Sequence, residues 1–151
     1  MLKGIDPLLS PELLKVLAEM GHGDEIVLAD ANFTAESLGR GKPLVRLPGV
    51  GMREACEAVL SVLPLDAAVA QPVAYMHVSD TPEGYCSALQ RDVIGQLGAR
   101  GEALPAQCEA MERFRFYERV SRAYAIVQTG EMQPFANFLF KKGVIANALA
   151  R

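Results

Sequence analysis

Residues 10–30, SPELLKVLAEMGHGDEIVLAD, encode a helix, a turn and a strand in succession, and this stretch decides the fold class. The SPE triplet at 10–12 is typical of a helix start, because the serine hydroxyl can cap the first turn and proline fits the first helical position. Apolar residues then recur at helical spacing as far as Met20. The next apolar run, Ile26–Ala29, is continuous rather than alternating, which indicates a strand buried on both faces.

Helical and strand patterns alternate along the rest of the chain. Alternation of this kind predicts a single three-layer α/β/α domain with a mostly parallel sheet. Little helix separates the last two strand patterns, so we expect the sheet to be mixed. The predicted elements are a helix over about Met52–Leu63, a strand over Pro72–Val78, a helix within 81–98, a strand over Cys108–Glu112, a helical turn over 116–123, and strands over Ala123–Gln128 and Asn137–Val144.

The overall composition indicates one soluble domain, residues 1–151. Half of the residues are hydrophobic, and the net charge is −3 with the basic residues scattered, which argues against a nucleic-acid-binding protein. No apolar run approaches the roughly 18 residues that a membrane span requires. Two prolines interrupt the first 14 residues, unlike a signal peptide. We therefore expect a cytoplasmic protein with no membrane partner.

The sequence lacks the familiar cofactor and metal motifs. Cys56, Cys86 and Cys108 have neither zinc-site spacing nor an even number, so we expect reduced and mostly buried thiols. GxGxxG, Walker, HExxH and GxSxG patterns are absent from the sequence. The expectation is a site without metal or cofactor, built from histidine, carboxylate, arginine and amide side chains.

His22 and Asp30 are the first candidates for chemistry. Histidine titrates near neutrality and can give and accept a proton, although His22 can also be an exposed histidine at a helix end. Asp30 follows the buried strand, where ligands gather in open α/β sheets. The two residues flank opposite ends of that strand. A shared site therefore requires that the glycine-rich loop folds back or that a neighbouring subunit contributes one residue.

Three segments carry a resemblance to a known family. They are LLSPELLKVLAEMGHGDEIVLADANF at 8–33, RFRFYERVSRAYAIVQTGE at 113–131 and NFLFKKGV at 137–144. Together they closely resemble the L-fucose mutarotase and D-ribose pyranase family (RbsD/FucU-like), and their residues are closer to those of the fucose branch. The resemblance implies a three-layer α/β/α fold, homo-oligomers that are often decameric rings, and cofactor-independent interconversion of the cyclic forms of free sugars.

The same resemblance implies roles for individual residues. His22 corresponds to the family's proton donor, and Asp30 and Arg113 to residues that bind the sugar, with Tyr117 as a neighbour. The family's Tyr-Gly-Asn tripeptide reads Phe135-Ala136-Asn137 in this chain. A hydroxyl is thus missing, so one hydrogen bond to the sugar should be lost, and we expect a more constrained backbone where alanine replaces glycine.

Three functions remain open from the sequence. The first is a mutarotase for L-fucose or a related monosaccharide, with His22 as the proton donor. The second is a monosaccharide-binding protein of the same fold with little catalysis, which the Phe135-Ala136 pair favours. The third is the interconversion of ribose pyranose and furanose forms.

Overall fold

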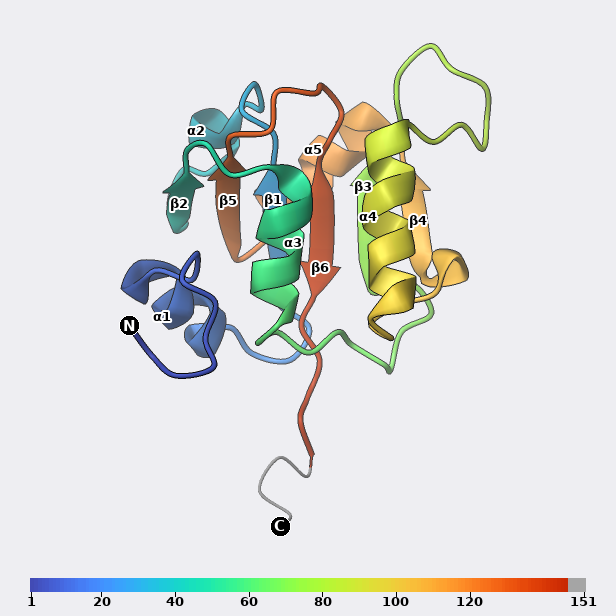
Figure 1. Ribbon diagram of the computed structural model, residues 1–151. Helices are drawn as coiled ribbons and strands as arrows, with labels where there is room; N and C mark the ends of the chain where they lie inside the picture. Colours follow the sequence, from blue (N-terminus) through green and yellow to red (C-terminus); the bar gives the residue numbers. More distant parts are fainter. Residues whose placement is uncertain (147–151) are drawn as a thin grey trace.

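The computed structural model describes residues 1–146, in which one six-stranded sheet lies between two layers of helices (Figure 1). Residues 147–151, the end of the predicted domain, lie outside the described residues. The elements are α1 (Pro11–Glu19), β1 (Glu25–Ala29), α2 (Ala35–Leu38), β2 (Leu44–Leu47), α3 (Met52–Leu60), β3 (Val73–Met76), α4 (Ala88–Ala99), the 3-10 turn η1 (Pro105–Gln107), β4 (Cys108–Met111), α5 (Arg113–Ser121), β5 (Ala125–Thr129) and β6 (Phe138–Lys141).

The sheet is mixed, as predicted, and β6 is the reason. The strand order is β2-β5-β1-β6-β3-β4, and the pairs β1/β5, β2/β5 and β3/β4 are parallel. β6 runs antiparallel to both of its neighbours, β1 and β3. The carboxyl ends of the five parallel strands therefore meet the amino end of β6 at one edge of the sheet, which is the upper edge in Figure 1.

Two hydrophobic clusters, one on each face of the sheet, confirm the three layers. Alternate residues of β1 point to opposite faces: Ile26 and Leu28 pack with residues of α1, α3 and α4. Val27 and Ala29 pack with residues of α2 and α5. All four side chains are fully buried, as the continuous apolar run predicted.

The helix starts follow local capping chemistry. The Ser10 hydroxyl accepts a hydrogen bond from the Leu13 N–H at 3.2 Å, and Pro11 occupies the first turn of α1, as predicted. The helix expected within 81–98 begins only at Ala88. Residues 81–86 instead form turns and irregular backbone, with Gly84 in the left-handed region at φ 83°.

Three short elements, α2, β2 and η1, were not predicted, and several bounds differ. The helix α2 has four residues, and β2 is a four-residue edge strand that exposes Arg46. Elements this short carry too few residues for a periodic signal. The structure also ends α3 at Leu60 rather than Leu63, and shortens β3 and β6 relative to the predicted strands.

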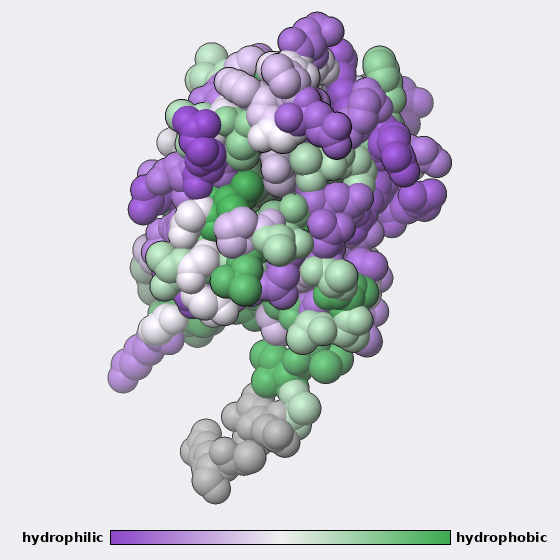
Figure 2. Space-filling view, turned by 90° about the vertical axis from the view of Figure 1, so that its right-hand side faces the viewer, coloured by the Kyte–Doolittle hydropathy of each residue, from purple (hydrophilic) through white to green (hydrophobic). Residues whose placement is uncertain are grey.

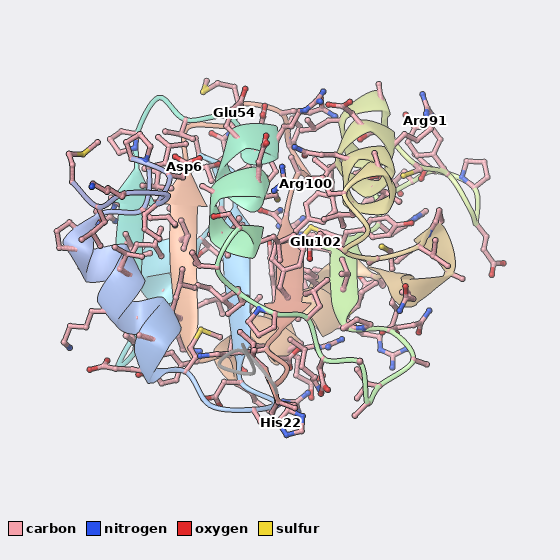
Figure 3. All side chains as sticks on the ribbon, turned by 60° about the horizontal axis from the view of Figure 1, so that its bottom comes forward. Asp6, His22, Glu54, Arg91, Arg100 and Glu102 are labelled. Carbon is pink, nitrogen blue, oxygen red and sulfur yellow. The ribbon has the colours of Figure 1, made fainter. Side chains whose placement is uncertain are left out.

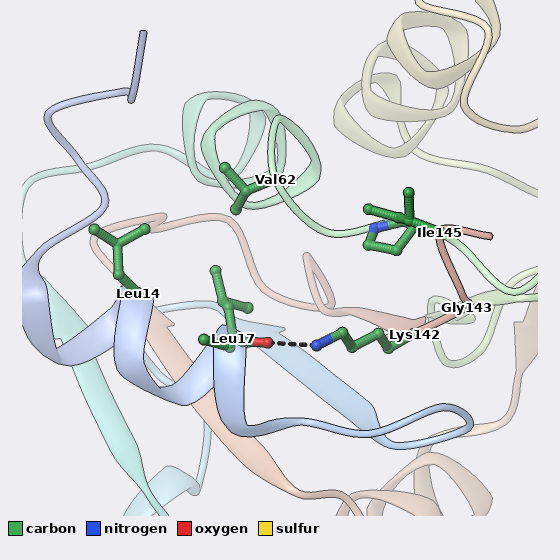
Figure 4. Close-up of a pocket in the computed structure, with 8 residues that line it drawn as sticks. Leu14, Leu17, Val62, Lys142, Gly143 and Ile145 are labelled. Atoms are coloured by element: carbon green, nitrogen blue, oxygen red, sulfur yellow. Dashed lines mark hydrogen bonds between the residues drawn. The ribbon is translucent and has the colours of Figure 1, made fainter. Parts of the chain in front are cut away.

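The C-terminal end of α1 is capped by a lysine from near the other end of the chain. Lys142 Nζ donates to the carbonyl oxygen of Leu17 at 2.7 Å (Figure 4). It also donates to the carbonyl oxygen of Met20 at 2.5 Å. A cation suits these unpaired carbonyls at the negative end of the helix dipole. The contact borders an apolar cavity of about 340 Å³ that Leu14, Leu17, Val62 and Ile145 help to line.

The three cysteines are free thiols. Cys56 and Cys108 are buried and Cys86 is half-buried, in agreement with the prediction. Burial raises the pKa of Cys108 to about 11, so this thiol stays protonated at neutral pH. Within residues 1–146 no helix is long and apolar enough to cross a membrane.

Candidate functional site

A cavity of about 230 Å³ opens at the carboxyl end of β1, where the parallel strands meet the start of β6. This is the edge at which open α/β sheets bind their ligands. Five of the residues expected to contact sugar come together here, and only Ala136 of that group does not line the cavity. The polar and aromatic lining residues are Asp30, Asn32, Phe33, Arg113, Tyr117, Phe135 and Asn137, and Met76 also lines the cavity.

Asp30 places a carboxylate in the wall of this cavity. The residue is 3% exposed, and its backbone N–H donates to Asn137 Oδ1 at 2.8 Å. Its Oδ1 accepts from the Asn32 N–H at 2.9 Å. Burial raises the pKa of Asp30, while hydrogen bonds from Asn32, Asn137 and the Ala136 backbone oppose the rise. The site therefore contains an acceptor that a sugar hydroxyl can satisfy.

The first turn of α5 supplies a cation and a phenol. The Glu112 carboxylate accepts from the Phe114 and Arg115 N–H groups and so caps the helix. Arg113 Nε donates to Tyr117 Oη at 3.0 Å, and its guanidinium carbon lies 5.3 Å from the centre of the Tyr117 ring. The arginine is thus held at the cavity with further N–H donors available for oxygen atoms.

The segment before β6 forms the remaining wall. Phe135 has a φ of 61°, a left-handed conformation that residues with a Cβ rarely adopt. Ala136 is buried and does not share this conformation, so its methyl group does not force a left-handed backbone. The strain lies one residue earlier. Asn137 is 2% exposed and directs its side chain to the Asp30 backbone.

His22 lies at the opposite end of β1 (Figure 3). Two backbone hydrogen bonds fix its loop there: the Gly23 N–H donates to the Lys142 oxygen, and the Lys142 N–H donates to the Asp24 oxygen, both at 2.8 Å. The five residues of β1 separate His22 from Asp30 by about 16 Å, at roughly 3.3 Å per residue. The alternative in which the glycine-rich loop folds back to Asp30 was therefore wrong.

Asp66 contacts His22 and was not singled out from the sequence. Its Oδ1 lies 3.2 Å from His22 Nε2, and the Asp66 side chain is 6% exposed against 52% for the histidine. A hydrogen bond from the Ala68 N–H, then one from His22, lowers the pKa of Asp66. Because a carboxylate can only accept, this pairing places the hydrogen on Nε2 and leaves Nδ1 of His22 free to exchange a proton.

Long-range packing brings this pair together. Leu65 forms an isolated antiparallel bridge with Lys142, and the Asp66 N–H donates to the Lys141 oxygen at 3.0 Å. A Cβ on Gly143 would collide with the Leu65 carbonyl oxygen, so glycine permits this close approach. No pattern within ten residues of His22 could have indicated a partner 44 positions away.

The two ends of the sheet offer complementary chemistry. One end holds a cavity with a carboxylate, a guanidinium and an amide, which suits a small polyhydroxylated molecule. The other end presents a carboxylate-oriented imidazole, which suits proton transfer. Among residues 1–146 no group of three or more histidine, cysteine, aspartate or glutamate side chains is placed to hold a metal ion.

Comparison with known proteins identifies relatives over nearly the whole chain. The model of the RbsD / FucU transport protein family matches residues 3–145. The fucose mutarotase of Bos taurus is 45% identical, with 96% of this chain and 95% of the relative covered. The L-fucose mutarotase of Actinobacillus pleuropneumoniae serotype 5b is 42% identical, with 95% and 97% covered. The crystal structure of the fucose mutarotase from Streptococcus pneumoniae in complex with L-fucose is 39% identical, with a TM-score of 0.85 and coverage of 96% and 100%.

Proposed function

This chain belongs to the RbsD / FucU family, and from that premise we propose that it is an isomerase, a mutarotase that interconverts the anomers of L-fucose or a closely related monosaccharide. The observation that supports the proposal most directly is the polar cavity that contains Asp30, Arg113 and Asn137. Several relatives with more than 40% identity are named fucose mutarotases. The enzyme works without a cofactor, as a single domain in the cytoplasm, where its free thiols stay reduced.

The proposed mechanism is acid–base opening and closing of the hemiacetal ring. His22 donates a proton to the ring oxygen, and the anomeric hydroxyl loses one to a base, for which the site offers the Asp30 carboxylate. Rotation about the adjacent carbon–carbon bond and reversal of both transfers give the other anomer. Arg113 and Asn137 hold hydroxyl groups, and Asp66 orients the imidazole. Acid–base catalysis of this kind contributes about 10²–10⁴-fold.

The active site is shared between two copies of the chain. Because His22 and the cavity lie at opposite ends of β1, the His22 of one copy completes the cavity of a neighbour in a homo-oligomer, with a decamer as our expectation. Exposed apolar side chains support contacts at both ends: Phe114 is 69% exposed beside the cavity, and Val144 and Ile145 follow β6. Figure 2 shows hydrophobic residues (green) gathered at the lower end of the molecule, where the chain continues beyond β6.

A second candidate is a monosaccharide-binding protein with little catalysis. Phe135 favours it, because the cavity lacks the hydroxyl expected from tyrosine and loses one hydrogen bond to the sugar. The exposed and carboxylate-paired His22 favours the enzyme. A pyranose–furanose isomerase for ribose is the third candidate and ranks below fucose, given the names of the relatives.

Saturation-transfer NMR on L-fucose, D-galactose and D-ribose tests the proposal, because it measures anomer and ring-form exchange directly. We expect the wild type to accelerate exchange of L-fucose and His22→Ala to lose about 10²–10⁴-fold of that rate. His77→Ala is the matched control, since His77 contacts Thr81 instead and should keep the wild-type rate.

Other results would change the assignment. Sugar binding without accelerated exchange would establish the binding protein. Fastest ring-form exchange with D-ribose would establish the ribose isomerase. Equal losses in His22→Ala and His77→Ala would remove His22 from the proposed role.

A further inference from the structure

Gln90 is a fully buried amide on α4 whose hydrogen bonds leave its own helix. Its Nε2 donates to the Met76 oxygen at 2.7 Å and to the Phe135 oxygen at 3.1 Å. Its Oε1 accepts from the Ser87 N–H at 3.0 Å. Both amide hydrogens and the amide oxygen are therefore engaged, and the residue is 0% exposed. This network ties α4 to the end of β3 and to the segment that precedes β6.

The two carbonyl groups that Gln90 binds belong to residues of the sugar cavity. Met76 and Phe135 both line it. Phe135 is also the residue with φ 61°, a conformation that persists in a side-chain-bearing residue only where the surroundings hold it. The Gln90 hydrogen bond acts directly on the peptide group that follows this strained residue.

That peptide group sets the position of the next two residues. The Ala136 backbone N–H opposes the rise in the pKa of the Asp30 carboxylate, and Asn137 Oδ1 accepts from the Asp30 N–H at 2.8 Å. A return of Phe135 to negative φ would rotate the Ala136 N–H and displace Asn137. Two polar groups of the cavity thus depend on the backbone conformation at Phe135.

Capping of α4 does not account for this arrangement. Ser87 and Gln90 form a capping box, in which the third helical residue needs only an oxygen that accepts from the N-cap N–H. A glutamate would supply that oxygen and would also suit the positive end of the helix dipole. Only the amide can donate two further hydrogen bonds, and both go to the cavity wall.

We propose that Gln90 is a positioning residue of the sugar site: its amide holds Phe135 in the left-handed conformation and so presents Asn137 and Asp30 to the sugar. The proposal rests on the proposed function only for the identity of the ligand. The constraint that the Gln90 hydrogen bonds place on the backbone of residues 134–137 is a property of the fold and can be measured without sugar.

Gln90→Glu and Ser87→Ala form a matched pair for the test. Gln90→Glu keeps the oxygen that accepts from Ser87 and removes both donors, whereas Ser87→Ala removes the hydroxyl cap and keeps both donors. Gln90→Met, neutral and of similar length, repeats the test if the new carboxylate prevents folding. Amide hydrogen exchange at 135–137 and the KM and kcat of sugar exchange are measured on each variant, together with its free energy of unfolding.

We expect Gln90→Glu and Gln90→Met to speed amide hydrogen exchange at 135–137 and to raise KM about tenfold, the usual scale for lost buried hydrogen bonds. Ser87→Ala should lose stability without either change. Unaltered amide hydrogen exchange at 135–137 in both Gln90 variants, or equal changes in Ser87→Ala, would overturn the proposal. A wild type that accelerates exchange of no sugar would refute the mutarotase instead, and the hydrogen-exchange result would still decide the role of Gln90.

Discussion

Asp30 is a carboxylate that the fold buries at some expense to stability. Because its folded-state pKa is raised above the usual 3.8, ionisation of Asp30 lowers the stability of the fold: this penalty begins as the pH rises above 3.8 and is complete above the folded-state pKa. Asp30→Asn should therefore raise the free energy of unfolding at neutral pH, with the gain shrinking as the pH falls through the folded-state pKa and vanishing below 3.8. The same variant should bind sugar about 10–100-fold more weakly, because it loses a charge-assisted hydrogen bond. Denaturation across a pH series and calorimetry measure the two effects.

Asp66 should behave with the opposite sign. Its folded-state pKa lies below 3.8, so its contribution to stability is complete above that pH and is lost as the pH falls through the folded value. Asp66→Asn should lower the free energy of unfolding at neutral pH, and the difference from wild type should vanish on acidification. The same denaturation series checks this prediction. A stabilising Asp66→Asn at neutral pH would show that the carboxylate does not pair with His22.

Phe135 tests whether the missing hydroxyl limits recognition of the sugar. Phe135→Tyr keeps the ring in the cavity wall and adds a donor and acceptor. We expect KM to fall about 2–10-fold, the usual net effect of one added hydrogen bond. Exchange kinetics over a range of L-fucose concentrations measure the change. An unchanged KM for every sugar would mean that the ring position is remote from the bound hydroxyl groups.

At the scale of single residues, the local sequence and the resemblance indicated some residues of the site and missed others. Asp30 could be placed because a buried strand ends at it, and the resemblance pointed to Arg113 and the 135–137 segment. Asp66 and Gln90 could not be found in this way. Each acts through a partner more than ten positions away, and that proximity exists only after β6 has paired within the sheet.

Among the elements, α5 connects helix stability with the site. Glu112→Ala removes the cap from the turn that carries Arg113 and should lower the free energy of unfolding by about 1 kcal/mol. It should also raise the KM for sugar, because the arginine loses its fixed position. Ser10→Ala on α1 is the control, since it removes a comparable cap far from the cavity and should change stability alone. The KM for sugar and the free energy of unfolding, measured on both variants, test this prediction.

The elements that the sequence revealed are those with their own periodic signal. Helix α1 and strand β1 combine strong capping with a continuous apolar run, and both were found nearly to the residue. Helix α2 and edge strand β2 escaped prediction because each has four residues and depends on neighbours for burial. The strand order also depends on long-range pairing, which no local pattern encodes.

For the whole molecule, mixing two inactive variants tests the shared site. His22→Ala retains an intact cavity, and Asp30→Asn retains an intact imidazole. Refolded together in equal amounts, they should recover up to about a quarter of the wild-type rate, because one neighbour in four pairings joins two intact halves. Each variant refolded alone is the control. Zero recovery in oligomers shown to be mixed would place the whole site within one chain.

The opposite placement of His22 and the cavity also determines how many working centres an assembly of copies contains. If the imidazole end of each chain meets the cavity end of the next in a head-to-tail contact, the copies join in a row rather than in two-fold pairs. Any open chain of copies, however long, then ends in one cavity that lacks its proton donor. A closed ring has no such end. Active-site titration should therefore give one working centre per polypeptide in the native assembly, and one fewer than the number of polypeptides in every fragment broken from it.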